Sequence, residues 1–454
     1  MMKIAIVTPG HPGSGVKSFP PALTAPYLAA LATPFAHSIR IYDLAVEPFD
    51  FYGPIPDVAM FTTTMAQSDH IFRIARFLKL HGSLIILGGP HATLAYGRDP
   101  RIQEIADTVI LGEAEKALPQ SLRDLIKGGR DALKPLYHTP VNSLSGMPFA
   151  RLDLLDSRRY YSVTCLIGTR GCPNRCAYCS IKSLYGRKYL RRPVEEVIEE
   201  IKYQTSRPGI SWTSKRFVTF WDDNPAGDLD WFHTLLEKLV PLKKSWISQM
   251  CLNVAESSET VRLMKRSGCL GIFAGIESVN PESLKGQNKN RINRIDRYTE
   301  QCHTFLRHGI QVIGAFMFGF DEDTPRSLTQ DTLSLATRMG LTLMQCHLNT
   351  PYPHLGYYET LLREGRLLTE EAKYFNGYTV VHRPSRIHPA LLQDAFLEVR
   401  QRFYSLPCML HRMVQHRVAD WPKFLFWQLL FRKPNYSSIP NVDVNLWHEH
   451  LNTL

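Results

Sequence analysis

The chain has 454 residues, of which 44% are hydrophobic and 21% are charged, and these proportions are typical of folded globular proteins. This composition excludes a disordered or fibrous chain, and the length predicts two or three domains. The net charge of +11 suits an anionic ligand, a nucleic acid or an acidic lipid surface. Because no basic run is interleaved with aromatic residues, and no helix-turn-helix or RNA-binding signature occurs, we expect no nucleic-acid partner.

The first residues and the cysteines indicate the compartment. The apolar run at 4–7 ends before Pro9, so it is too short for a signal peptide or a membrane span and predicts a first strand. Nine cysteines without an export signal indicate reduced thiols rather than a disulfide framework. We therefore expect a cytoplasmic protein whose thiols can bind metal.

Residues 1–140 show short apolar runs that alternate with helix-like stretches. Buried strands are predicted at 3–8, 39–42, 58–61, 84–87 and 108–111. Helices are predicted at 26–31, 71–80 and 115–126. Short runs that are apolar throughout are typical of strands buried on both faces. This region is therefore predicted to form a Rossmann-like, doubly wound parallel sheet.

Several of these strands are followed directly by glycine. In doubly wound sheets the ligand crevice lies beyond the carboxyl ends of the strands, where glycine lets the backbone approach a ligand closely. Tight turns explain the same glycines equally well. The candidate ligand-binding residues at these strand ends are Pro9, Gly10, His11, Gly88, Gly89, Pro90, Gly112 and Glu113.

A second alternation follows residues 141–158, which are predicted to be a linker. Its strands are predicted at 163–169, 217–221, 246–251, 270–276, 311–318 and 343–348. Its helices are predicted at 194–204, 231–239, 258–266, 298–307 and 328–338. Residues 159–384 are thus predicted to form a partial (β/α)6 barrel of the TIM type, with its chemistry at the carboxyl ends of the strands.

Residues 385–454 change to a helical, basic and aromatic composition. The apolar run at 424–431 is broken by Gln428 and is too short to span a membrane. We expect a helical cap packed on the barrel, and a peripheral contact of this tail with a membrane surface is the alternative.

Three closely spaced cysteines follow the first barrel strand, where a catalytic loop is expected. Cys172, Cys176 and Cys179 have the spacing CxxxCxxC, which chance rarely produces in a chain with so few cysteines. Structural zinc usually takes four protein ligands, and no second pair lies nearby. An iron-sulfur cubane bound by three cysteines keeps one iron open for a substrate or cofactor, so we favour a cluster over zinc.

With Tyr178 before the last cysteine, this segment resembles the defining motif of the radical S-adenosylmethionine (SAM) superfamily. The resemblance implies that the three cysteines hold a 4Fe-4S cluster whose open iron is chelated by SAM. It also implies that one electron cleaves SAM to a 5'-deoxyadenosyl radical. A flavodoxin- or ferredoxin-type protein is the implied electron donor.

Other strand ends resemble the SAM-binding segments of this superfamily in the same order. They follow the second, fourth and fifth barrel strands, near the expected positions of the methionyl amino group, the ribose and the adenine. Taken singly, each is also an ordinary polar or tight turn. The implied SAM contacts are Tyr178, Asp222, Asp223, Asn224, Glu277, Gly319 and Phe320.

The resemblance extends to the class of this superfamily with an N-terminal cobalamin (B12)-binding domain. It depends on the segments 19–21, 88–91, 111–115 and 352–368. The D-x-H-x-x-G signature, whose histidine replaces the lower axial base of cobalamin, is absent, since His11 lacks the preceding aspartate. Cobalamin binding without a protein ligand to cobalt and loss of this cofactor both stay open. The strand-end residues given above would form the cobalamin site.

The class includes methyltransferases, so the resemblance implies cobalamin-dependent methyl transfer to an unactivated carbon of a small molecule or lipid in specialised metabolism. A non-methylating radical SAM enzyme, catalysing an oxidative cyclisation, a rearrangement or transfer of another SAM fragment, is the alternative. A non-catalytic sensor that binds a cluster or a corrinoid is a third hypothesis. The candidate substrate contacts at the barrel mouth are His347, Tyr352 and His354, and ordinary loop packing explains them as well.

Overall fold

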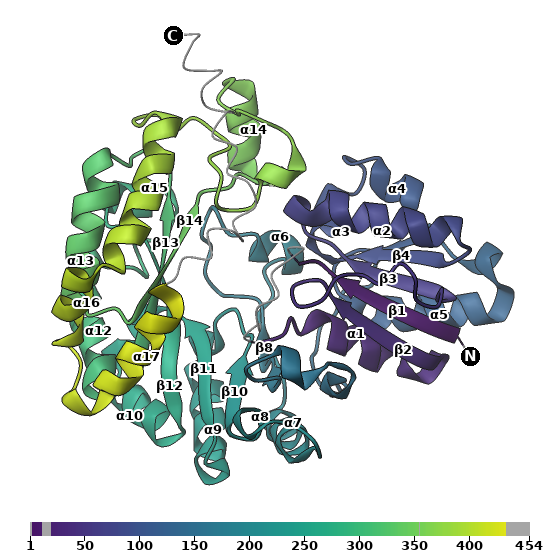
Figure 1. Cartoon of the computed structure of the whole chain (residues 1–454), viewed down its shortest axis with the longest axis horizontal. Helices are drawn as coiled ribbons and strands as arrows, with labels where there is room; N and C mark the ends of the chain where they lie inside the picture. Colours follow the sequence, from purple (N-terminus) through teal and green to yellow (C-terminus); the bar gives the residue numbers. More distant parts are fainter. Residues whose placement is uncertain (1, 11–19, 354, 433–454) are drawn as a thin grey trace. The chain divides into compact units, whose positions relative to one another are not determined.

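The computed structural model describes residues 2–10, 20–353 and 355–432. The chain divides into two compact units (Figure 1). The first contains Met1–Gly171 and Ser180–Trp221, and the second contains Cys172–Cys179 and Asp222–Leu454. The predictions made for His11, His354 and 433–454 lie outside the described residues.

The first sheet is parallel, as the sequence predicts, and it adds a sixth strand, β6, to the five predicted. Its strands are β1 (Met2–Thr8), β2 (Ala36–Asp43), β3 (Val58–Thr62), β4 (Leu84–Gly88), β5 (Thr108–Ile110) and β6 (Leu136–Tyr137). Their order is β2-β1-β3-β4-β5-β6, which reverses direction between β1 and β3. In such sheets the ligand crevice lies at this reversal, outside the carboxyl ends of the strands.

Five helices connect the strands of the first sheet. They are α1 (Thr24–Ala32), α2 (Ser68–Leu80), α3 (Gly89–Ala95), α4 (Arg101–Ile105) and α5 (Ala114–Gly128). The glycine-rich segment 88–91 is more than a turn, because α3 begins at Gly89 with Pro90 in its first turn. Proline suits that position, where its missing N–H would have no helical acceptor.

The second sheet also contains six strands and confirms the predicted α/β barrel architecture. They are β7 (Cys165–Leu166), β10 (Phe217–Phe220), β11 (Ser245–Met250), β12 (Cys269–Glu277), β13 (Gln311–Phe318) and β14 (Leu343–Leu348), in the order β14-β13-β12-β11-β10-β7. The main helices between them are α7 (Val194–Ser206), α9 (Leu229–Leu239), α10 (Ser258–Arg266), α12 (Tyr298–Arg307) and α13 (Thr332–Arg338).

Three predictions about local elements need correction. The strand predicted at 163–169 is interrupted, because β7 ends at Leu166 and a separate β8 (Thr169–Arg170) pairs antiparallel with β9 (Leu190–Arg191). The helix predicted at 328–338 begins as a π-helical turn, Ser327–Asp331. The segment 141–158, expected as a linker, contributes Val141, Leu144 and Met147 to the first core.

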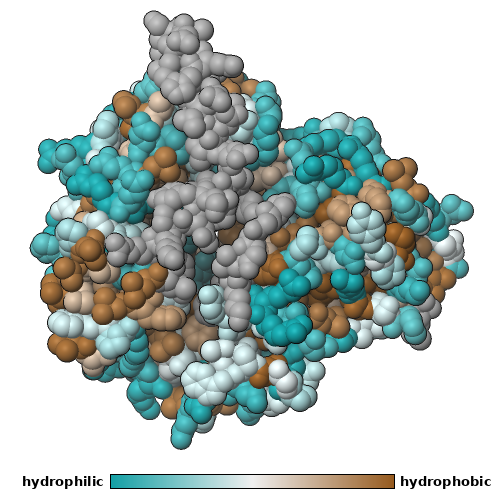
Figure 2. Space-filling model, viewed as in Figure 1, coloured by the Kyte–Doolittle hydropathy of each residue, from teal (hydrophilic) through white to brown (hydrophobic). Residues whose placement is uncertain are grey.

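The described part of the C-terminal region is helical, as predicted. It contains α15 (Pro389–Phe403), α16 (Leu406–Met413) and α17 (Trp421–Arg432), and α14 (Gly356–Arg363) precedes it. Phe403 and Phe424 are buried, so α15 and α17 each turn an aromatic side chain into the second unit. Apolar residues also gather on the surface over α16 and α17 (Figure 2). No helix within the described ranges is long and apolar enough to cross a membrane.

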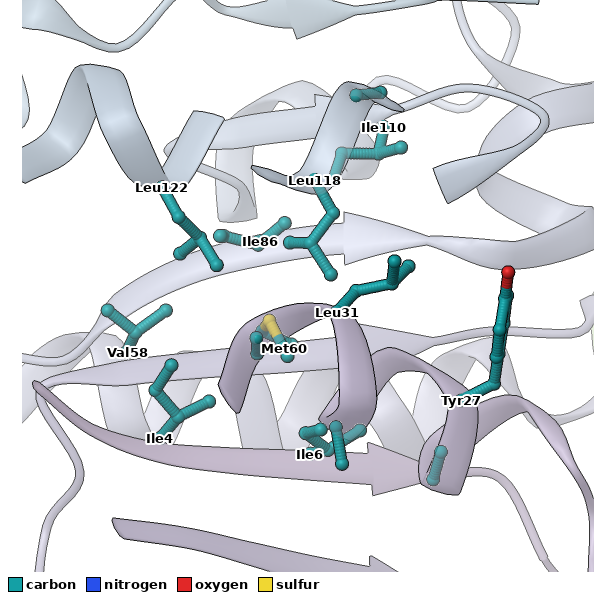
Figure 3. Packing of buried hydrophobic residues seen from close by; sticks show 14 of the residues in the cluster. Ile4, Ile6, Tyr27, Leu31, Val58, Met60, Ile86, Ile110, Leu118 and Leu122 are labelled. Carbon is teal, nitrogen blue, oxygen red and sulfur yellow. The ribbon is translucent and has the colours of Figure 1, made fainter. Parts of the chain in front are cut away.

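Two apolar cores lie on opposite faces of the first sheet. One joins the strand residues Ile4, Met60 and Ile86 to Leu31 of α1 and Leu118 of α5 (Figure 3). The other packs alternate strand residues against α2, α3 and α4. Successive side chains of a strand point to opposite faces, so strands apolar throughout require helices on both sides.

Candidate active site

The three motif cysteines lie on the loop 172–179, which follows β8 and begins the second unit. Gly171 precedes them with φ +87°, and a Cβ there would lie 2.2 Å from the carbonyl oxygen of Lys188. The backbone N–H of Cys179 donates to the carbonyl oxygen of Cys176 at 3.3 Å, which closes a tight turn between these two ligand candidates. Glycine and this turn therefore set the path of the loop.

All three cysteines are partly exposed. Burial raises the pKa of Cys172, and an Asn224 amide nitrogen lies 3.9 Å from its sulfur. Within the described residues, no three His, Cys, Asp or Glu side chains are grouped so as to hold a single metal ion. A cubane makes a different demand, because each cysteine binds a different iron corner.

The predicted segment 222–224 follows β10 directly. Asp222 and Asn224 are buried, and the backbone carbonyl of Asp223 accepts a hydrogen bond from Gln249 at 3.1 Å. A cysteine that the motif does not include also contacts the loop, since the Asn174 amide donates to the Cys251 sulfur at 3.3 Å. Burial raises the pKa of Cys251 to about 11, which keeps it a neutral thiol.

Glu277 ends β12 in a backbone conformation that is unusual for a residue with a side chain. Its φ is +67°, next to an irregularity in the pairing of β12 with β13. Strained backbone of this kind clusters at functional sites, where the surrounding structure holds it. Gly275 makes room for its side chain, because a Cβ at that glycine would lie 2.2 Å from the Glu277 carboxylate oxygen Oε1.

The Glu277 carboxylate forms a buried ion pair that sequence reasoning missed. Its partner is Lys289, with Nζ 3.4 Å from Oε1 and side chains only 8% and 11% exposed. Burial is the largest single effect and lowers the pKa of Lys289, but the Glu277 carboxylate and the thiols of Cys176 and Cys251 together raise it above its usual value. Burial, and then the Glu277 charge, raise the pKa of Tyr178, which is hydrogen-bonded to the same carboxylate. The structure thus brings together Tyr178 of the cysteine loop and Glu277 of β12.

The predicted adenine segment forms a turn whose organising residue sequence reasoning also missed. One carboxylate oxygen of Asp323 accepts the backbone N–H groups of Gly319 at 2.9 Å and Phe320 at 3.0 Å. Its other oxygen accepts the Ser283 hydroxyl at 2.7 Å. Burial raises the pKa of Asp323 to about 6. The rings of Phe320 and Tyr178 lie 6.2 Å apart between centroids, so the turn adjoins the cysteine loop.

We expect replacement of Asp323 by Ala to loosen this turn. Two buried N–H groups would lose their acceptor, and each unsatisfied group costs about 1–3 kcal/mol. Urea unfolding should show a loss of about 2–6 kcal/mol for the two groups together, and equilibrium dialysis should show weaker SAM binding. D296A is the matched control. Asp296 lies in the turn just before α12, and its side chain is 62% exposed, so the protein should tolerate this replacement. Equal SAM binding by D323A and D296A would contradict the role given to Asp323.

A cavity of about 470 Å³ lies in the first unit, at the carboxyl ends of its strands. Five of the predicted strand-end residues line it, together with apolar residues of the sheet and of α1 and α5. These five are Gly88, Gly89, Pro90, Gly112 and Glu113. Pro9 and Gly10 do not line it. A Cβ at Gly10 would lie 1.9 Å from the backbone nitrogen of Ala45, so packing explains that glycine.

A buried charge network forms one wall of this cavity. The Arg170 guanidinium contacts Glu113 at 2.9 Å and Glu115 at 2.5 Å, and its side chain is 11% exposed. The Tyr27 hydroxyl donates to Glu115 at 3.5 Å. Arg170 lies two residues before Cys172 in the sequence. Sequence reasoning did not select it, because its partners lie more than fifty residues away.

His347 and Tyr352, the candidate substrate contacts that the structure describes, each have a polar partner within the protein. Nε2 of His347 lies 2.6 Å from the Gln345 amide nitrogen, and burial lowers the pKa of His347 to about 4. The Tyr352 hydroxyl donates to the carbonyl oxygen of Phe375 at 3.5 Å. Substrate contact by these two residues stays a prediction.

Known proteins resemble the chain in sequence and in fold. Residues 166–332 match the family model of the radical SAM superfamily. The bacteriochlorophyllide d C-12(1)-methyltransferase of Chlorobaculum tepidum is 26% identical over 383 residues, covering 83% of this chain and 80% of the relative. The hopanoid C-2 methylase of Rhodopseudomonas palustris is 26% identical over 304 residues, covering 64% and 55%.

A solved structure shares the fold over most of the chain. The radical SAM methyltransferase TsrM from Kitasatospora setae, solved with cobalamin and a 4Fe-4S cluster, superposes with a TM-score of 0.64 at 13% identity, covering 92% of this chain and 89% of TsrM.

Residues 166–332 form a radical SAM domain, and the chain is a radical SAM enzyme. Both similarities cover more than four fifths of the chain, and the fold shared with TsrM includes the N-terminal sheet. Membership implies a 4Fe-4S cluster and SAM as cofactors.

Proposed function

We propose that this enzyme is a cobalamin-dependent methyltransferase that modifies an unactivated carbon of an apolar small molecule or lipid. The observation that carries the proposal is the cavity at the strand ends of the first sheet, at the place where doubly wound sheets bind ligands. Its volume of about 470 Å³ suits a drug-sized molecule or one part of a larger ligand.

The lining of the cavity fits part of a cobalamin. Apolar side chains, among them Met60, Ile86 and Leu118, offer an unhydrated surface, and Thr62, Thr93 and Glu113 offer polar groups. Gly89 has φ +89°, and a Cβ there would lie 2.3 Å from the Thr62 hydroxyl oxygen. Any larger residue would therefore shift the cavity wall.

When bound, the cluster and SAM supply radical chemistry, and cobalamin supplies a transferable methyl group. The chain's own residues bind and orient. Cys172, Cys176 and Cys179 would hold the cluster, while the Glu277 carboxylate, held by Lys289, would accept hydrogen bonds from the ribose hydroxyls of SAM. Phe320, which is 1% exposed, gives that region an apolar wall. This arrangement fixes the nucleoside while excluding water.

The relatives support the substrate class. Their names specify a bacteriochlorophyllide and a hopanoid as the molecules that they methylate. We include in the proposal an electron donor of the flavodoxin or ferredoxin type. The net charge of +11 favours association with an acidic donor.

Product analysis tests the proposed reaction. The anaerobically reconstituted holoenzyme should be incubated with a low-potential reductant, SAM carrying a deuterated methyl group and the lipid and pigment fraction of a cell extract. Methyl transfer predicts S-adenosylhomocysteine together with a deuterated product. Formation of 5'-deoxyadenosine without S-adenosylhomocysteine would contradict methyl transfer and favour the non-methylating alternative.

The cavity assignment has its own test, which requires no substrate. We expect G89A to bind aquacobalamin with a dissociation constant at least about tenfold higher than that of the wild type in equilibrium dialysis, because the added Cβ collides with the cavity wall. G82A is a matched control, since Gly82 has φ +95° but nothing within 4 Å of its Cβ position. Both variants strain the backbone, and only one alters the cavity. Equal cobalamin binding by the two variants would contradict the assignment.

A further inference from the structure

Helices α16 and α17 and the segment between them expose several apolar side chains. The C-terminal apolar face, as we name it, consists of Leu406, Leu410, Val414, Val418, Phe426 and Leu429. Each of these side chains is at least 50% exposed, and Val418 is 71% exposed. Figure 2 shows apolar residues gathered on the surface over the two helices that Figure 1 labels α16 and α17. Contiguous apolar surface of this kind marks an interaction site.

The spacing of these residues shows that the face is additional to the core of the second unit. Leu406, Leu410 and Val414 follow each other at intervals of four residues, so they form one stripe along α16 and the residue after it. The opposite side of the helix already fills the core through Met409 and Arg412, which are buried. The same division occurs in α17, where Phe424 is buried and Phe426 is 59% exposed.

The charges around the face are almost all positive. Residues 404–432 contain a single carboxylate, Asp420, and four Lys or Arg residues. Arg412 is buried on the core side of α16, so the charge beside the face comes from Arg417 and Lys423. Asp420 is buried and lies 3.3 Å from Lys423 and 3.8 Å from Arg417. The side chains of those two cations are about half exposed, so they present positive charge to the solvent beside the apolar stripe.

We propose that the C-terminal apolar face docks on the surface of an anionic phospholipid bilayer. A helix pair with an exposed apolar stripe and a basic border is the arrangement that lies in a membrane interface, where apolar side chains enter the acyl boundary and cations meet lipid phosphates. The half-buried Trp421 and Trp427 add the amphipathic rings that favour this depth. A twofold contact between copies of this face would add no carboxylate from 404–432 beyond Asp420, which the two cations of each copy already share.

Vesicle flotation tests this proposal with the full chain and needs no turnover, so its result is separate from that of the proposed methyl transfer. The wild type should float with vesicles of phosphatidylcholine containing 30% phosphatidylglycerol. Binding to pure phosphatidylcholine should be at least about tenfold weaker, and binding to the anionic vesicles should fall as salt increases. A wild type that stays unbound, or binds both vesicles equally at all salt concentrations, would overturn the proposal.

Variants locate the contact. The triple variant L410Q/V414Q/F426Q removes apolar area from exposed positions, so its thermal unfolding should match the wild type while its vesicle binding falls at least about tenfold. The control L80Q/I126Q changes two residues of the first unit that are 85% and 56% exposed, and it should bind as the wild type does. Vesicle binding that survives the triple variant but disappears on deletion of 433–454 would overturn the proposal, as would a wild-type dimer that the triple variant dissociates.

Discussion

Replacing any one of Cys172, Cys176 and Cys179 by Ala should abolish assembly of a complete cluster and the reductive cleavage of SAM. A cubane with three protein ligands has no spare thiolate, so the loss of one frees a second iron corner. Iron and sulfide analysis after anaerobic reconstitution should give substoichiometric values, and the broad charge-transfer absorbance of the wild type should be lost.

Cys408 provides the matched control for these variants. It is also partly exposed, but it lies in α16 rather than on the loop 172–179. C408A should therefore assemble the cluster and cleave SAM as the wild type does. Full iron content in C176A, or equal loss in C408A, would contradict the assignment of the ligands.

The variant E277Q should be the most destabilised of the single replacements in the SAM site. It would leave the buried Lys289 ammonium without its carboxylate partner, and breaking a buried ion pair from one side costs about 3–5 kcal/mol. Urea unfolding should show this loss. SAM binding should also fall, since the amide replaces a charged acceptor of ribose hydrogen bonds.

The double variant E277Q/K289M separates these two effects. Removing both charges should restore most of the stability, because no buried ion is left unpaired, whereas SAM binding should stay weak. A loss below about 1 kcal/mol in E277Q would contradict the buried pair. Recovery of SAM binding in the double variant would contradict the role of Glu277 as a ligand of SAM.

The periodic parts of the fold were predictable from the sequence. Strands such as Ile4–Val7 are apolar throughout, and helices such as α10 have one polar and one apolar face. Local pattern alone therefore identifies them. The strands β6 and β7 have two residues each, and runs that short carry no period. The segment 141–158 has the composition of a linker, and only its tertiary packing buries Val141 and Leu144.

The candidate site was predictable where a motif carries it. The cysteines are recognisable by spacing, and Glu277 by its place at a strand end. Lys289 and Asp323 lie on loops without a distinctive pattern, and their roles arise from burial beside a carboxylate or beneath a turn. Arg170 reaches Glu113 across 57 residues, a contact that only the folded chain creates. These roles depend on tertiary contacts, which sequence pattern alone does not reveal.

The most direct test of the central claim is the metal content and SAM turnover of the wild-type protein reconstituted without oxygen. A radical SAM enzyme built on these three cysteines should hold about four iron and four sulfide atoms per chain. After reduction it should convert SAM to fragments that the C176A variant does not form. A protein that holds zinc, or that binds iron but leaves SAM intact after reduction, would contradict the account.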